Sequence, residues 1–382
     1  MRIVHVSDCY APRLGGIETQ VRALAMRQAR AGHDVHVITA TASQSGSIAA
    51  RSGTELLEGV RVHRLVAHLP FDLPVHPRVV PEVRNLLCAG GAAGGADAVH
   101  VHGGVVSPFA YPAAQVGAAL GLPTVVTIHG VWGPLMGPAA ALADRLISWS
   151  RWGVLITAVS DAAADPIRAV VPGLDVRIVP NGIDVEAWQI QHVTGEDGVI
   201  RMLSVMRLAP RKRGIPLLRV VSAAQARLGT RRLELRILGD GPARQLLVTY
   251  AGRLGVADQV QLLGRVSPDQ VREELARADV FLAPSRRESF GIAALEARTA
   301  GVPVIAYDGT GVTSFVRDGV EGLLAADDGQ LADAVVRISL DDALRARIAH
   351  HNRSTAPEQG WSSVLPLIEQ LYALAATGHA TT

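Results

Sequence analysis

Two glutamates lie eight positions apart in the stretch RRESFGIAALEARTAG, residues 286–301. They are Glu288 and Glu296. We predict that RRES is a loop and that a helix follows, beginning at Phe290 and ending at Gly301. About 10 Å of helical rise would separate the two carboxylates, which is too far for a dyad acting on one atom. The spacing suits two anchors on one elongated ligand, because carboxylates accept hydrogen bonds from adjacent hydroxyls such as those of a sugar. The alternative is a pair of surface charges on an ordinary helix.

The start of that helix offers hydrogen-bond donors as well. Free N–H groups near Phe290, Gly291 and Ile292 would lie between the two glutamates, where a phosphate or a hydroxyl could bind them. The helix is otherwise apolar at FGIAAL, so a Glu296 on its buried side needs a partner. Both features favour a ligand site over a solvated helix face.

A basic turn, MRLAPRKRG (206–214), follows another predicted strand. Arg207 and Lys212 lie on either side of its proline, with Arg211 and Arg213 beside them. The guanidinium fork of arginine and the ammonium group of lysine both neutralise phosphate oxygens, so the turn could hold a diphosphate. A solvated charge run is the competing interpretation. The position of the turn after a strand favours phosphate binding.

Glycines and histidines follow predicted strands in the first half of the chain. GGIE precedes the first helix, and Gly15 and Gly16 would let a phosphate approach main-chain N–H groups, although an ordinary strand–helix turn also uses glycine. The segment does not complete a GxGxxG dinucleotide fingerprint. His102 and His129 each lie at the carboxyl end of a strand, where open α/β sheets bind ligands. We favour His129, because its strand leads into the loop GVWGPLMGP.

Short apolar runs that alternate with Ala/Leu-rich helical stretches must position these residues. Many of the runs are apolar nearly throughout, as in a parallel sheet covered on both faces. We predict strands at 2–7, 35–39, 61–67, 98–102, 124–129, 155–160 and 176–180, and a second series at 201–206, 233–238, 259–264, 279–285, 303–307 and 322–326. The expected fold is α/β, with two doubly wound Rossmann-like domains facing a central cleft. Their predicted bounds are 1–188 and 199–357, with a linker at 189–198 and a C-terminal helix at 358–382.

Composition limits the class of protein. The formal net charge of the 382 residues is only +2, and the basic residues lack interleaved aromatics, so we expect no nucleic-acid partner. Two cysteines without a CxxC pair favour a reducing cytoplasm over a disulfide framework. The first apolar run is too short for a signal peptide, and no run reaches about 18 apolar residues, the length expected of a membrane span.

With those residues placed, the sequence resembles the GT-B glycosyltransferases of the large retaining family 4. The resemblance covers nearly the whole chain: GGIE, HVHGG, TIHG, AVS, VPNGID, RLAPRKRG, LGDGP, LLGRVS and the Glu-x7-Glu pattern from Glu288 to Glu296. The Glu-x7-Glu pattern is highly specific, PNGID and the Arg-x4-Lys spacing less so. The family's C-terminal helix crosses back to the first domain, and the same is expected of the helix containing Trp361.

The resemblance also implies roles for single residues. Gly15 and Gly16 would lie by the donor diphosphate, which Arg207 and Lys212 would bind while stabilising the leaving group. Main chain around Arg265 and Val266 would meet the nucleobase, Glu296 the ribose, and Glu288 the transferred sugar. Backbone contacts would come from Ser289, Phe290, Gly291 and Ile292, and His129 would lie near the reaction centre.

The implied activity is a retaining transfer of a hexose from a GDP-sugar or UDP-sugar to a glycan, lipid-linked or small-molecule acceptor. No Asp-x-Asp pair occurs, and a basic pair does the work of a metal ion, so no metal or other cofactor is expected. The alternatives on the same architecture are a sugar-nucleotide epimerase, a phosphorylase and a non-catalytic paralogue. A phosphorylase needs a lysine for pyridoxal phosphate, and Lys212 is the only lysine.

The acceptor side is marked by apolar residues. Leu69, Phe71, Leu73 and Val75 would form an apolar lip together with Trp132, Leu135 and Met136. Such a lip would receive a lipid-linked acceptor at the inner face of the plasma membrane, where a cytoplasmic enzyme binds peripherally. The competing interpretation is a folded-down loop.

Overall fold

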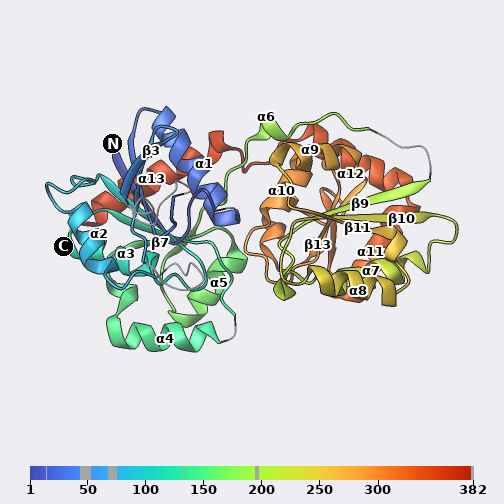
Figure 1. Ribbon diagram of the computed structural model, residues 1–382, viewed down its shortest axis with the longest axis horizontal. Coiled ribbons are helices and arrows are strands. Elements are labelled where there is room, and N and C mark those ends of the chain that lie inside the picture. The colour runs from blue at the N-terminus through green and yellow to red at the C-terminus, as the bar shows by residue number, and fades with distance from the viewer. Residues whose placement is uncertain (14, 44–52, 68–74, 134, 194–197, 380–382) are drawn as a thin grey trace. The chain divides into compact units, whose positions relative to one another are not determined.

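The computed structural model describes residues 1–382 except 14, 44–52, 68–74, 134, 194–197 and 380–382. Its contacts divide the chain into two compact units, shown in Figure 1: Met1–Gly182 with Ser362–Thr382, and Ile183–Trp361. The first unit ends before residue 188, the expected boundary, because α6 (Val185–Trp188) packs on α10 (Ile292–Thr299) of the second unit. The described part of the predicted linker also joins the second unit, where the Val193 N–H donates to the Ala276 carbonyl at 2.8 Å.

The first unit is built on an eight-stranded sheet with the order β3-β4-β2-β1-β5-β6-β7-β8. All neighbours are parallel except β3 and β4. The strands are β1 (Arg2–Ser7), β2 (Asp34–Thr39), β3 (Gly53–Leu57), β4 (Val60–Arg64), β5 (Ala98–Gly103), β6 (Thr124–Ile128), β7 (Leu155–Ala158) and β8 (Val176–Ile178). The helical segments are α1 (Gly16–Arg30), α2 (Val79–Leu87), α3 (Ala110–Ala119), α4 (Met136–Ile147), η3 (Trp149–Arg151), α5 (Asp161–Val170) and α13 (Trp361–His379).

Amphipathic helices cover this sheet as the sequence predicts. Val21, Leu24 and Ala25 of α1 are buried, and Gly32 ends the helix at a φ of +89°, a conformation that favours glycine. The C-terminal helix α13 belongs to the same unit, where Tyr372 is 1% exposed. The expectation that the chain's last helix returns to its first domain is confirmed.

The second unit has a six-stranded, wholly parallel sheet with the order β11-β10-β9-β12-β13-β14. Its strands are β9 (Val199–Val205), β10 (Arg232–Leu238), β11 (Val260–Gly264), β12 (Val280–Ala283), β13 (Val304–Tyr307) and β14 (Gly322–Ala325). Its other helical segments are η4 (Pro210–Lys212), α7 (Gly214–Gln225), α8 (Arg244–Arg253), η5 (Ala257–Gln259), α9 (Pro268–Arg277), α10 (Ile292–Thr299), η6 (Gly311–Ser314), α11 (Asp328–Leu340) and α12 (Asp342–Ser354).

Each sheet has one point where the strand order reverses. In the first unit this switch lies between β1 and β5, and in the second it lies between β9 and β12. Loops that leave the carboxyl ends of two such strands diverge and leave a crevice, which is where open α/β sheets bind ligands. The basic turn follows β9 and the loop with Glu288 follows β12, so the fold places these two motifs at the same switch point.

Candidate active-site residues in the two units

Lys212 and Glu288 form an ion pair at the switch point of the second unit. The Lys212 Nζ donates to Glu288 Oε2 at 2.6 Å, and the two side chains are 26% and 20% exposed. Residues 76 positions apart in the chain thus meet because β9 and β12 are neighbours in the sheet. The pair combines a cation that binds phosphate with a carboxylate that binds hydroxyls, and both side chains keep some access to solvent.

Strained and glycine-rich backbone holds this pair in place. Arg213, which follows Lys212, has a φ of +62°, so the chain turns sharply from η4 into α7. On the other side the Gly311 N–H donates to the Glu288 carbonyl at 2.8 Å. Gly291 has a φ of +93°, and a Cβ there would lie 2.7 Å from Val312. Glycine is therefore required between Glu288 and α10.

Arg213 of the basic turn and Arg286 of the loop after β12 both pair with Asp328. Arg213 donates to both carboxylate oxygens of Asp328 at 2.7 and 2.8 Å, and Arg286 stacks over Tyr307 at 4.8 Å. The Tyr307 hydroxyl also donates to Asp328, at 2.6 Å. These groups form a structural cluster at the start of α11 that the sequence does not reveal.

Arg207 and Arg211 are exposed instead, and Arg207 pairs with no residue that the structure describes. Arg207 therefore has its guanidinium available for an anion. Lys212 lies in the same loop, is 26% exposed and is paired with Glu288, so the two residues predicted to bind a diphosphate differ: Arg207 is exposed and Lys212 already has a carboxylate partner.

The helix after Glu288 begins two residues later than we predicted. α10 starts at Ile292, with Gly291 at the N-cap and no side chain capping its first N–H groups. Phe290 is 1% exposed and belongs to the core, while Ser289 is half-buried in the preceding loop. The later start arises because Gly291 adopts a left-handed conformation that interrupts the helix.

Glu296 consequently lies nearer to the start of the helix than we expected. Its Cα is separated from that of Ile292 by about 6 Å of rise. The side chain is half-buried, and burial of the carboxyl group raises the pKa of Glu296 to about 8, although Arg272 acts in the opposite direction. Near neutral pH the group is mostly protonated, so it both donates and accepts a hydrogen bond.

The remaining donor-side predictions fall on loops. Arg265 is exposed and Val266 half-buried, between the end of β11 and α9. In the first unit, Gly16 is the first residue of α1 and Gly15 is its N-cap, with extended backbone and no side-chain cap. The backbone conformation at position 15 therefore does not require glycine. A Cβ there would instead lie 2.4 Å from the Glu18 carboxylate.

His129 lies directly after β6 in the first unit and is half-buried. Its N–H donates to the Gly103 carbonyl at 2.8 Å, which fixes the backbone beside the end of β5. Burial lowers the pKa of His129 to about 4, although a hydrogen bond with the Asn181 side chain acts in the opposite direction. The ring is therefore neutral near pH 7, when it can act as an acceptor.

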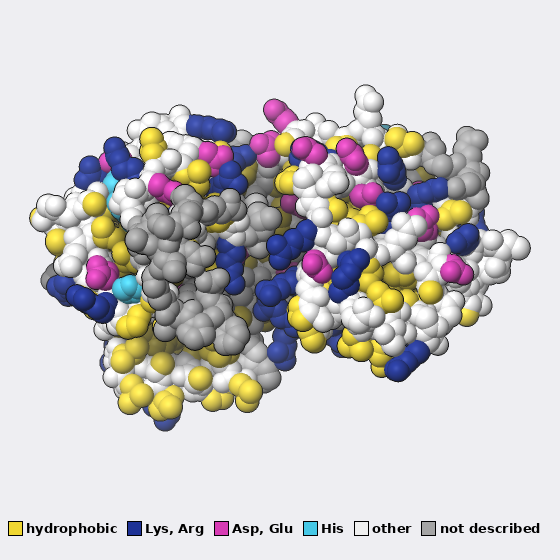
Figure 2. All heavy atoms as spheres, viewed as in Figure 1, with side chains coloured by type: hydrophobic (Ala, Val, Ile, Leu, Met, Phe, Trp, Pro, Cys, Tyr) yellow, Lys and Arg dark blue, Asp and Glu magenta, His cyan; other side chains and the backbone are white. Residues whose placement is uncertain are grey.

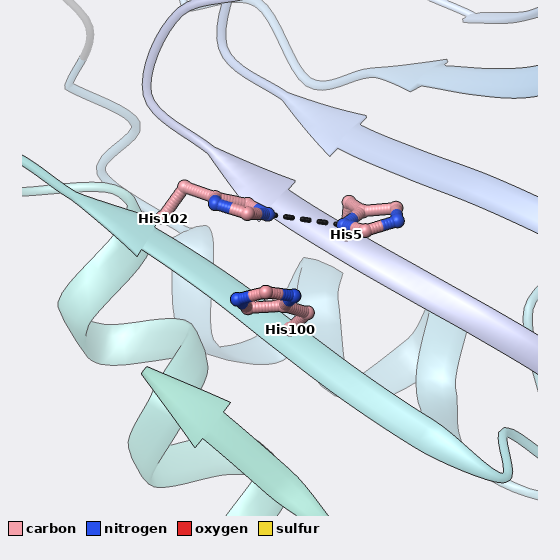
Figure 3. A group of neighbouring side chains, drawn as sticks. All are labelled: His5, His100 and His102. Atoms are coloured by element: carbon pink, nitrogen blue, oxygen red, sulfur yellow. Dashed lines mark hydrogen bonds between the residues drawn. The ribbon is translucent and has the colours of Figure 1, made fainter. Parts of the chain in front are cut away.

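Behind His129 the structure reveals a cluster that sequence reasoning missed. Figure 3 shows His5 of β1 beside His100 and His102 of β5, and their ligand atoms lie within 4.8 Å of one another, as in a metal site. However, all six ring nitrogens are engaged in hydrogen bonds, to Gln28, Tyr372, Thr127, His129 and each other. No lone pair is left over for a cation, so the cluster is a hydrogen-bonded core.

Of the apolar lip that we expected, Leu69, Phe71 and Leu73 lie outside the described residues. Trp132 is half-buried and packs edge-on against Trp149, at 6.2 Å between ring centroids. Leu135 is 85% exposed next to the start of α4. The described part of the lip therefore continues into α4.

Comparisons with known proteins agree with these motifs. The model of Glycosyltransferase Family 4 matches residues 14–187, and that of Glycosyl transferases group 1 matches residues 187–355. A glycogen synthase of Mycobacterium tuberculosis is 29% identical, over 99% of this chain and 96% of that protein. A D-inositol 3-phosphate glycosyltransferase of Acidothermus cellulolyticus is 30% identical, over 97% of this chain and 89% of that protein.

Solved structures show the same fold. The structure of Anabaena HepE in complex with UDP-glucose covers 98% of this chain and 99% of its own, with 20% identity and a TM-score of 0.70. The two alternatives kept from the sequence, an epimerase and a non-catalytic paralogue, are not favoured by relatives that are glycosyltransferases. The chain therefore belongs to the GT-B glycosyltransferases of family 4, and its activity is glycosyl transfer.

Proposed function

We propose that the protein transfers a hexose from a nucleoside-diphosphate sugar with retention of configuration and without a metal ion. The observation that carries this proposal is the Lys212–Glu288 pair at the switch point of the second unit. Without a donor the two side chains neutralise each other. With a donor, the ammonium group would be shared between Glu288 and the diphosphate, so donor binding and sugar orientation are coupled through one contact.

The proposed roles follow from the charge that the reaction creates. Breaking the bond between the anomeric carbon and the phosphate oxygen leaves that bond's electron pair on the diphosphate. Lys212 and Arg207 would stabilise this charge as it grows. Glu288 would hold hydroxyls of the sugar, and the uncapped N–H groups at the start of α10 would add further donors. In the front-face mechanism the departing phosphate takes the proton of the acceptor hydroxyl, whose oxygen bonds to the same face of the sugar.

The proposed donor is a UDP-hexose or a GDP-hexose of the glucose, N-acetylglucosamine or mannose type. HepE was solved with UDP-glucose, which supports a uridine nucleotide as the first choice. The sequence has no Asp-x-Asp pair for a divalent metal, and Arg207 and Lys212 would supply positive charge to the diphosphate. We therefore propose that no metal or other cofactor takes part.

A nucleotide-sugar panel tests this function. Thermal unfolding with UDP-glucose, UDP-N-acetylglucosamine and GDP-mannose should show stabilisation by one of them, because a ligand that binds only the folded state raises the unfolding temperature. Release of nucleoside diphosphate should then require an acceptor, with the α-anomer of an α-linked donor retained in the product. Conversion of the bound donor to an epimer without any acceptor would contradict the proposal.

The pKa of Glu296 gives donor binding a pH dependence. If ribose hydroxyls bind the carboxylate, the proton must leave first, so the donor dissociation constant should fall about tenfold per pH unit from about pH 6 to about pH 8, and then level off. Calorimetric titration at several pH values measures this. Glu296→Gln, which cannot ionise, should bind with little pH dependence. A wild-type profile as flat as that of the variant would contradict a ribose-binding carboxylate.

A surface of the first unit supports the expectation of membrane contact. Leu135, Leu142 and Leu146 are 85%, 57% and 74% exposed, and their spacing places them along one side of α4, followed by Ile147 at 51%. Figure 2 shows hydrophobic side chains gathered over α4. None of the described helices combines the length and the hydropathy that crossing a bilayer requires. We propose that this α4 stripe binds the inner face of the plasma membrane, where a cytoplasmic enzyme would meet a lipid-linked acceptor.

The α4 stripe predicts a vesicle-binding defect in a double variant. Leu142→Glu with Leu146→Glu should reduce co-sedimentation with anionic lipid vesicles at least about tenfold, because two apolar side chains that would insert become charged. Leu246→Glu with Val248→Glu makes the same change on α8, where exposed apolar residues do not form a stripe, and should leave binding unchanged. Equal binding by the wild type and the α4 variant would rule out the membrane proposal.

A further inference from the structure

A continuous chain of hydrogen bonds leads inward from His129. The Nε2 of His129 lies 3.1 Å from His102 Nδ1, and His102 Nε2 lies 3.0 Å from His5 Nδ1. His5 Nε2 in turn lies 2.7 Å from the side-chain oxygen of Gln28, whose amide nitrogen donates to the Tyr372 hydroxyl at 3.1 Å. The chain thus links His129, at the end of β6, with the C-terminal helix α13.

The chain continues from Tyr372 back into the sheet. The Tyr372 hydroxyl lies 2.9 Å from His100 Nδ1, and His100 Nε2 lies 2.7 Å from the Thr127 hydroxyl. Thr127 lies 2.7 Å from the Thr157 hydroxyl, which donates to the main-chain carbonyl of Val126 at 3.4 Å. The last partner is a carbonyl oxygen, which only accepts.

With Thr157 as the donor to the Val126 carbonyl, one direction follows for every bond of the chain. If Thr157 donates to the Val126 carbonyl, it accepts from Thr127, and Thr127 accepts from His100. A neutral imidazole has one donor and one acceptor nitrogen, so each bond then determines the next one. The orientation of the Gln28 amide agrees with this direction of donation, because its oxygen faces His5 and its nitrogen faces Tyr372. His102 and His129 are accordingly both protonated at Nε2.

The surroundings keep the rings neutral, as this scheme requires. His5, His100 and His102 are 0%, 2% and 3% exposed. Burial lowers the pKa of His5 to about 4 and holds the pKa of His100 and His102 well below the usual value. Because the hydrogen-bond chain ends at a carbonyl oxygen inside the sheet, a proton that entered it at His129 could not leave at the other end. It therefore holds groups in position and does not conduct protons.

We propose that Gln28, His5, His102 and Tyr372 are positioning residues that hold His129 as the Nε2–H tautomer, with Nδ1 as an acceptor. The Tyr372 hydroxyl keeps Gln28 from turning over, so the C-terminal helix is part of the His129 site. A reversed Gln28 amide would reverse the tautomers of His5, His102 and His129 together. The inference rests on the proposed function and on the position near the reaction centre that the family resemblance implies for His129.

Tautomers are read directly by two-bond 1H–15N correlation NMR of the full chain labelled with 15N-histidine. The signals of His129 are those that disappear in His129→Gln. The proposal expects a protonated Nε2 and an unprotonated Nδ1 for His129. A protonated Nδ1, or an exchanging mixture in the wild type, would overturn it.

A Tyr372→Phe variant tests the link to α13. Without the hydroxyl both orientations of Gln28 become comparable, so His129 should show a tautomer mixture, and kcat should fall about tenfold with the donor KM unchanged. Tyr10→Phe removes the hydroxyl of another buried tyrosine of the same unit, one that is not part of the hydrogen-bond chain. It should change neither the His129 tautomer nor kcat. An unchanged His129 tautomer in Tyr372→Phe would contradict the proposal that the Tyr372 hydroxyl fixes the orientation of Gln28.

A pair of Gln28 variants keeps the test decisive if Tyr372→Phe fails to fold. Gln28→Met removes the group that accepts from His5, so His129 should become a mixture of tautomers. Gln28→Glu keeps an oxygen that accepts from His5, so His129 should remain the Nε2–H tautomer. Equal spectra for the two variants would overturn the proposal. The NMR result stands even if the wild type transfers no sugar, which would instead refute the proposed function. If the wild type holds one His129 tautomer and Gln28→Met loses it without any change in kcat, the positioning role is refuted.

Discussion

Replacing Lys212 by alanine is expected to lower kcat about 100- to 1,000-fold, the range seen when one preorganised group that stabilises developing charge is removed. The reason is the position of its ammonium group, 2.6 Å from Glu288 at the switch point between β9 and β12. The variant loses a charge that should count most when the diphosphate departs, so kcat should fall more than donor affinity. Steady-state kinetics with a saturating acceptor measures both quantities.

Arg211 provides the matched control for this change. It is the neighbouring residue, it is cationic, and it is exposed. Arg211→Ala should therefore change kcat less than about threefold, since a solvated surface charge contributes little. Lys212→Arg should recover part of the activity, because the charge is kept but its geometry changes. Equal losses in Lys212→Ala and Arg211→Ala would mean that general electrostatics, and not this pair, drives the reaction.

Replacing Glu288 by glutamine is expected to lower kcat about 100-fold. Glutamine keeps the size of the side chain and a hydrogen-bond acceptor but loses the charge that holds Lys212, so the ammonium group is no longer fixed in place. The backbone should be unaffected, since the Glu288 carbonyl remains the acceptor for Gly311. Unchanged thermal unfolding with reduced turnover is the expected combination.

Glu273→Gln makes the same chemical change at an exposed position on α9 and should leave turnover unaffected. A Glu288→Gln enzyme that keeps near wild-type turnover would remove Glu288 from the site. A strongly raised donor KM in that variant, with kcat unchanged at saturating donor, would assign Glu288 to donor binding alone.

Much of the fold was predictable because parallel strands buried on both faces are apolar nearly throughout. All thirteen predicted strand runs overlap an observed strand, and both sheets are doubly wound as expected. β3 was missed because GTELL has no apolar run and its residues are largely exposed in an antiparallel edge strand. The start of α10 was misplaced because the left-handed Gly291 interrupts a sequence with helical character.

The donor side was predictable residue by residue but not in its contacts. Sequence motifs identified Lys212 and Glu288 separately, whereas their direct ion pair depends on the order β9–β12 in the sheet. The histidine chain could not be predicted, because Gln28 and Tyr372 are 344 positions apart and meet only when α13 packs on the first unit. His5 and His100 looked like ordinary strand residues, and the sequence gives no sign that their rings share hydrogen bonds.

Donor binding at the Lys212–Glu288 pair is tested most directly on Lys212 itself. Because it is the only lysine among 382 residues, a chain labelled with 13C-lysine gives one lysine side-chain signal. Glu288→Gln should shift that signal in the absence of ligand, and the nucleoside-diphosphate sugar that the thermal panel selects should shift it in the wild type. If that donor binds, as calorimetry shows independently, and the Lys212 signal stays where it was, the diphosphate is not bound at this pair and the proposed role of Lys212 is wrong.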